Sequence, residues 1–175
     1  MPTAKRSAKD GDLSAFSAEY DGNATSELFF EALGNRDAEA RWEISRRLLD
    51  DGADASPVAS GQSTLSILLG AHRRLGEHDG ELAQRLVDAG ASVNYRERRG
   101  QLVIHLAAMT RADADEDRRQ LYAAFFSSPT LDLSLPVNPT IPDVTIRQWL
   151  DGLVERVPDK REVLAEFLAA HPASP

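Results

Sequence analysis

Apolar residues recur along the chain in quartets at positions i, i+1, i+4 and i+5, a spacing that places all four on one helix face. The pattern occurs four times, with Ser45 as a polar member of the first quartet, and successive quartets begin 38, 39 and 42 positions apart. The quartets begin at Ile44, Leu82, Leu121 and Val163. Upstream of each quartet, an apolar residue opens another predicted helix, with steps of 37, 39 and 42 positions. These residues are Leu28, Leu65, Ile104 and Ile146. The spacing of the quartets and the spacing of the upstream apolar residues increase in parallel along the chain. The sequence therefore predicts four repeats of a two-helix unit.

The residue that follows each quartet by three positions predicts how the second helix of the unit ends. It is Gly52 in the first repeat and Gly90 in the second, and glycine adopts the positive φ of a helix C-terminal cap at little cost. In the third repeat it is Pro129, which cannot adopt that conformation. In the fourth it is His171. We therefore expect two glycine-capped helices and different ends for the other two.

Two stretches resemble the ankyrin-repeat family. Residues 86–94, with the sequence Leu-Val-Asp-Ala-Gly-Ala-Ser-Val-Asn, are similar to the end of the ankyrin outer helix. Residues 100–108, Gly-Gln-Leu-Val-Ile-His-Leu-Ala-Ala, are similar to the opening of the inner helix. The resemblance implies an all-α fold, an ankyrin-repeat solenoid of helix-loop-helix units with short extended fingers between them.

The chain departs from the family in its period, which is about six residues longer than the usual 33. We expect these additional residues between the two helices of each repeat, where they lengthen the helices or the loop. The predicted repeats lie near 25–60, 61–99, 100–141 and 142–172, within a domain of residues 21–175. Residues 1–20 have no such period, and we expect a polar, mobile arm. The alternative is a short turn that packs over the first repeat through Leu13, Phe16 and Tyr20.

Composition narrows the choice of partner. The chain has 175 residues, a net charge of −8 and no cysteine. An acidic surface repels phosphate backbones, so we expect no nucleic-acid binding. The net charge either suits a basic protein partner or serves only solubility. No stretch approaches the roughly 18 apolar residues of a membrane span, and no secretory signal opens the chain. We therefore predict a cytoplasmic monomer that binds no membrane, cofactor or metal. The alternative is self-association through the open ends of the repeat stack.

Two groups of residues suggest catalysis or metal binding as the alternative function. The loop between His72 and Asp79 holds two histidines and two acids, and Asp113 opens an acidic run that ends at Asp117. A small hydrolase or a metal protein would use such inter-helix loops. The simpler interpretation is that both are solvated loops. For His105, at the ankyrin histidine position, the resemblance implies structural hydrogen bonds between neighbouring turns.

The resemblance implies that a partner is held by finger tips and by the concave face of the inner helices. In the third repeat, the implied contact residues are Arg96, Arg98, Arg99, Gln101, Met109 and Thr110, with Tyr95 beside them. Tyrosine and arginine dominate binding hot spots because they combine contact area with directional polar groups. The alternative is an ordinary solvated turn.

The last finger is rich in proline, and it either presents Val137 and Ile141 to a partner or only bridges a longer gap. The leading hypothesis is therefore a protein-binding scaffold that recognises one specific partner. Small stand-alone ankyrin chains resemble, among others, inhibitors and immunity proteins, and charge complementarity would speed the encounter with a basic enzyme.

Overall fold

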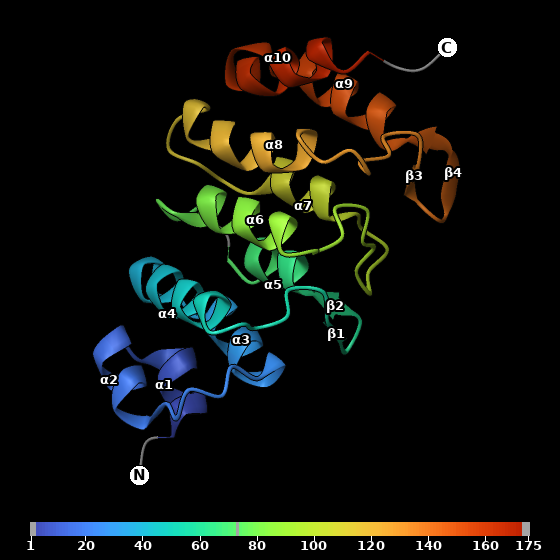
Figure 1. Ribbon diagram of the computed structural model, residues 1–175. Helices are drawn as coiled ribbons and strands as arrows, with labels where there is room; N and C mark the ends of the chain where they lie inside the picture. The colour runs from blue at the N-terminus through green and yellow to red at the C-terminus, as the bar shows by residue number, and fades with distance from the viewer. Residues whose placement is uncertain (1–2, 73, 173–175) are drawn as a thin grey trace.

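The computed structural model describes residues 3–72 and 74–172, and in these residues the fold is predominantly helical, with ten α-helices, two 3-10 helices and two small hairpins. Four helix pairs follow one another along the chain (Figure 1). The pairs are α3 (Ser26–Leu33) with α4 (Ala38–Asp50), α5 (Thr64–Gly70) with α6 (Asp79–Asp88), α7 (Val103–Met109) with α8 (Arg119–Phe126), and α9 (Ile146–Arg156) with α10 (Glu162–Ala170).

The pairs are stacked in two layers. The second helices α4, α6, α8 and α10 pack in order, each against the next, while α3 packs against α5 and α5 against α7. Figure 1 shows the stack rising from the N-terminal to the C-terminal pair, with both hairpins on one side. The core follows the predicted quartets: of their 16 side chains only Leu49, Val87 and Phe167 are not fully buried. The apolar spacing was therefore a correct guide to which helix faces meet.

The helices α4 and α6 end as predicted. Gly52 and Gly90 have φ of 90° and 97°. In α4, the Gly52 amide donates to the Leu49 carbonyl and the next amide donates to the Leu48 carbonyl, 3.0 and 2.9 Å. The end of α6 repeats this pair of bonds, which defines a Schellman motif. The cap turns the chain away from the stack and toward the hairpin side.

The residues between paired helices take several forms. The linker between α7 and α8 contains a 3-10 helix, η1 (Glu116–Arg118), and that between α9 and α10 contains η2 (Pro158–Lys160). Between α5 and α6 the chain forms a loop, and in the first pair the second helix is itself 13 residues long. Both forms expected for the additional residues, a longer helix and a longer linker, are therefore present.

The N-terminal segment differs from the mobile arm that we expected. Residues 4–19 form two helices, α1 (Ala4–Asp10) and α2 (Leu13–Glu19), which pack on α3 and α4. Phe16 is fully buried and stacks on Tyr20 with ring centroids 4.7 Å apart. Each helix begins with a side-chain cap, from Thr3 and from Asp12. These residues cover the first helix pair, because they bury its otherwise open apolar end.

Candidate protein-binding surface

Three extended segments form a row on the hairpin side of the stack. The first is the hairpin of β1 (Val58–Ala59) and β2 (Gln62–Ser63), and the last is the hairpin of β3 (Pro136–Asn138) and β4 (Ile141–Thr145). The middle segment has one antiparallel bridge, between Arg96 and Leu102. We call residues 57–63, 94–102 and 136–145 the finger row. The middle finger lies between the two labelled hairpins in Figure 1.

Hydrogen bonds join the three fingers. The Arg98 amide donates to the Gly61 carbonyl of the first finger at 3.0 Å. The Arg96 guanidinium donates to the carbonyl of Pro136 in the third finger at 2.5 Å and to the next carbonyl at 3.2 Å. The third finger also approaches closely, since a Cβ atom added to Gly100 would lie 3.3 Å from Pro139 Cδ. The row is therefore one connected surface.

Glu97 shapes the tip of the middle finger from inside. Only 7% of this residue is exposed, and its Oε1 accepts the amides of Arg99 and Gln101 at 2.7 and 3.2 Å. The Glu97 amide donates to the Gln101 carbonyl at 2.9 Å, which closes the turn. Because the carboxylate is turned inward, the side chains at the tip are those of Arg98 and Arg99, which are both exposed.

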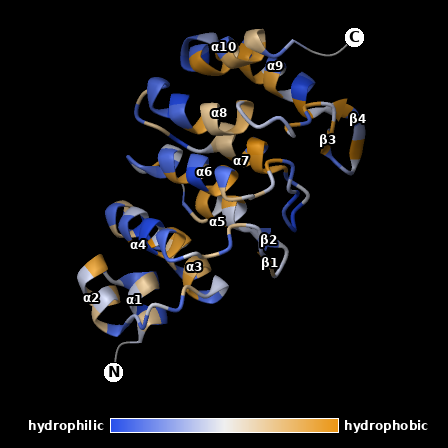
Figure 2. Cartoon of the chain, viewed as in Figure 1, coloured by the Kyte–Doolittle hydropathy of each residue, from blue (hydrophilic) through white to orange (hydrophobic). Residues whose placement is uncertain are grey.

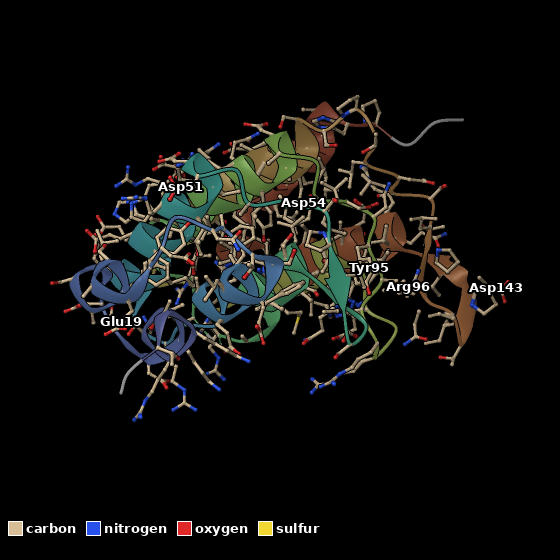
Figure 3. The ribbon with its side chains drawn as sticks, turned by 60° about the horizontal axis from the view of Figure 1, so that its bottom comes forward. Glu19, Asp51, Asp54, Tyr95, Arg96 and Asp143 are labelled. Carbon is tan, nitrogen blue, oxygen red and sulfur yellow. The ribbon has the colours of Figure 1, made fainter. Side chains whose placement is uncertain are left out.

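The structure places the nine predicted contact residues in three classes. Arg98, Arg99, Met109 and Ile141 are exposed, whereas Tyr95, Arg96 and Gln101 are half-buried. Tyr95 and Arg96 are labelled beside the third finger in Figure 3. Arg96 supports the row through its bonds to backbone carbonyls and has few donors left for a partner. The remaining two residues are buried.

Thr110 and Val137 were wrongly predicted to face a partner. Thr110 is 8% exposed because α7 ends there: its hydroxyl donates to the Leu106 carbonyl at 2.9 Å, and its own carbonyl accepts two bonds from Arg118. Val137 is 7% exposed because it is the middle residue of β3, whose neighbours on both sides turn outward. Of the two predicted residues in the third finger, Val137 and Ile141, only Ile141 is therefore exposed.

Val58 is a surface residue that the predicted contact set omitted. It is 54% exposed at the first finger, which is comparable to Ile141 at 51%. Val58 lies one position outside the turn of the first hairpin, whereas Ile141 directly follows the turn of the third. Its place in a two-residue strand of a finger could have indicated its exposure. Among the described residues, only four large apolar side chains are clearly exposed: Val58, Met109, Ile141 and Val157.

His105 does not make the hydrogen bonds between neighbouring turns that the resemblance implied. Its ring stacks on Trp149 of α9 with centroids 4.1 Å apart, and its Nδ1 is buried with no hydrogen-bond partner among the described residues. The Nε2 atom lies 3.3 Å from the Gln101 amide nitrogen. Burial lowers the pKa of His105, so the ring is held neutral between α7 and α9.

The loop between α5 and α6 is occupied by structural contacts. His72 Nε2 lies 3.0 Å from the Leu33 carbonyl, to which it donates, and His78 stacks on Trp42 at 5.2 Å. Asp79 is buried and accepts two bonds from the Arg41 guanidinium, both at 2.8 Å. Arg73, inside this loop, lies outside the described residues. In the part of the chain that the structure describes, no three His, Asp or Glu residues are grouped as metal ligands.

The burial of Arg41 was not predicted from the sequence. Arg41 is charged and lies close to the first quartet, but it is 2% exposed, and it also donates to the Asn35 carbonyl at 2.7 Å. Each of the first three quartets is preceded, three positions earlier, by a charged residue: Arg41, Asp79 and Arg118. The side chain of each residue forms a hydrogen bond with the backbone of the segment before its helix. Aligning the quartets would have shown charged residues at one repeated position, which is the available signal.

The pH dependence of stability follows from two of these histidines. Burial lowers the pKa of both His72 and His105. Below about pH 6.5, the ordinary value, the unfolded chain therefore binds more protons than the folded chain, so the free energy of unfolding falls as the pH decreases. We expect urea unfolding to show lower stability at pH 5.5 than at pH 7.5. The double variant His72→Gln, His105→Gln should lose most of this difference, and an unchanged difference would contradict the assignment.

Comparison with known proteins adds a fold-level likeness. No family model matches the chain, and no curated protein matches it in sequence. A solved structure, that of a functionally unknown protein from Leptotrichia buccalis, superposes with a TM-score of 0.72 at 18% identity. The match covers 99% of this chain and 96% of that one. The class that the fold defines is a predominantly helical stack, and the likeness shows a shared fold alone. Within the described residues, no helix is long and apolar enough to cross a membrane.

Proposed function

We propose that the protein is a divergent ankyrin-repeat stack whose finger row binds one specific protein partner. The observation that supports this proposal is the location of the exposed apolar side chains. Of the four clearly exposed large apolar side chains in the described chain, Val58 and Ile141 lie on the finger row, and Met109 ends α7, the helix that follows the middle finger. Exposed apolar side chains on neighbouring surface segments, as Val58 and Ile141 are, are typical of protein-binding sites.

The connected fingers give a physical reason for binding without rearrangement. The backbone of the row is fixed by bonds between fingers and by the Glu97 carboxylate, so little order has to be gained when a partner docks. Pre-organisation of this kind raises affinity because it reduces the entropy lost on association. An inhibitor or immunity role, and a basic partner, remain predictions from the sequence. The buried Arg41–Asp79 pair does not support catalysis by the inter-helix loops, because both oxygens of the Asp79 carboxylate accept hydrogen bonds from Arg41.

Site-specific photo-crosslinking tests the proposal. A photoreactive amino acid is placed at Ile141 in one variant and at Ala89, an exposed residue at the end of α6, in another. In extracts of the source cells, we expect the first variant to crosslink one protein that the second does not. The residue at Ala89 is a matched control because it is also exposed but lies in the other helix layer. Equal crosslinking at the two positions, or none at either, would contradict the proposal.

A further inference from the structure

We infer that the middle finger binds an acidic linear segment of the partner, one with apolar residues beside its carboxylates. The inference rests on the proposed function and specifies the chemistry of the segment that docks. It starts from the charge of the finger row. In a chain with a net charge of −8, the exposed charges at the tips are two cations, Arg98 and Arg99.

Carboxylates near these arginines are turned away or lie elsewhere. The tip of the first finger, 57–63, contains no charged residue, and neither does 136–142 of the third. Glu97 is buried beneath the turn. Asp143 is exposed, but Figure 3 shows it on the far side of the third finger from Arg96. The hydropathy colouring agrees, because the middle finger is the hydrophilic segment between the two labelled hairpins (Figure 2).

Both guanidinium groups are available to a partner. Within residues 3–72 and 74–172, neither Arg98 nor Arg99 makes a side-chain hydrogen bond or an ion pair, in contrast to Arg96 beside them. Their backbones are nevertheless fixed, since the Arg98 amide bonds to Gly61 and the Arg99 amide to Glu97. An arginine fork matches a carboxylate in a bidentate geometry, so two neighbouring arginines on a fixed backbone favour a segment with acidic side chains.

The apolar neighbours extend this specificity. Val58 and Ile141 stand on the fingers to either side of the middle finger, each about half exposed. A segment that crosses the row would therefore meet an apolar side chain, then two arginines, then a second apolar side chain. The complementary segment carries Asp or Glu in the centre and large apolar residues toward its ends.

The net charge suits a basic partner or serves only solubility, but that charge is an average over the chain. Many of its carboxylates lie on the second helices and the inter-helix loops, for example Glu43, Asp88 and Asp117. A basic segment docked on the finger row would face Arg98 and Arg99 at close range, and like charges in contact oppose binding. The local charge of the surface, and not the sum, decides which segment fits.

Selection from a displayed library of short random peptides tests this inference. The bait is the full chain, and it is compared with the variant Arg98→Glu, Arg99→Glu. A matched control is Arg156→Glu, Lys160→Glu, because both residues are exposed, make no ion pair in the described chain, and lie at the far end of α9 from the third finger. Each variant's fold is checked by its circular dichroism spectrum.

The inference predicts that the enriched peptides combine Asp or Glu with large apolar residues. A synthetic copy then binds the Arg98→Glu, Arg99→Glu variant at least about tenfold more weakly and the matched control about as tightly as wild type. Binding also weakens with added salt.

Any of four results would overturn it. Enriched peptides that lack acidic residues but need Val58 and Ile141 would refute the acidic segment while leaving the binding surface intact. An enriched peptide that tolerates the Arg98→Glu, Arg99→Glu change, or no enrichment at all, would refute the inference, and the crosslinking at Ile141 would then decide the proposed function separately. A single-stranded oligonucleotide that binds through Arg98 and Arg99 would assign the surface to nucleic acid.

Discussion

Asp79→Asn is expected to lower the free energy of unfolding by about 3–5 kcal/mol, because it leaves the buried charge of Arg41 without a partner. The two side chains are 4% and 2% exposed, and both Asp79 oxygens accept from the guanidinium. One of these oxygens also accepts the Gly76 amide at 2.7 Å. The pair joins the first helix pair to the start of α6, so its loss should separate the first two units of the stack. Urea unfolding measures the change.

Two variants serve as controls for this result. Asp113→Asn removes an exposed carboxylate that pairs with Arg74, and screening by water should make its effect small. Arg41→Met removes the buried cation, and in that background Asp79→Asn should cost much less than it does alone, since the two losses are coupled. If Asp79→Asn costs no more than Asp113→Asn, the ion pair does not join the two units.

Phe125→Ala should cost about 3–5 kcal/mol, because it removes a fully buried ring from the centre of the stack. Phe125 belongs to α8, which packs against α6 on one side and α10 on the other. The cavity would therefore weaken two interfaces at once, and in a stack of repeats such nearest-neighbour interfaces supply much of the stability. Thermal and urea unfolding, followed by circular dichroism, should show a single weakened transition.

Phe30→Ala is the matched control for Phe125, since it makes the same chemical change at a half-buried position of α3. Its expected cost is clearly smaller, because less apolar area returns to water and no closed cavity forms. An equal cost for the two variants would contradict a core that is shared by the stacked second helices.

The sequence pattern was a sufficient guide to the four helix pairs, because local rules determine them. The quartets set the buried faces, and Gly52 and Gly90 cap two helices through bonds within six residues. The helices α1 and α2 were missed because their apolar positions do not share the repeat's spacing, although Thr3 and Asp12 are ordinary N-terminal caps.

The candidate site was only partly predictable, since exposure depends on contacts between distant segments. Arg96 was expected to meet a partner, but its donors are used by carbonyls 40 and 41 residues away in the third finger. The partner of Arg41 is 38 positions away, so no local pattern marks that arginine as buried. Arg98, Arg99 and Ile141 were placed correctly at the surface, because finger tips have few neighbours in any register.

The most direct test of the binding surface is an affinity measurement with the protein crosslinked at position 141. Isothermal titration calorimetry would compare wild type with Val58→Asp, Ile141→Asp, and with the control Ala89→Asp, Ala169→Asp on exposed ends of the second helices. The finger-row account predicts that the first variant binds at least about tenfold more weakly and that the control binds like wild type. Unchanged affinity for the Val58→Asp, Ile141→Asp variant would contradict it.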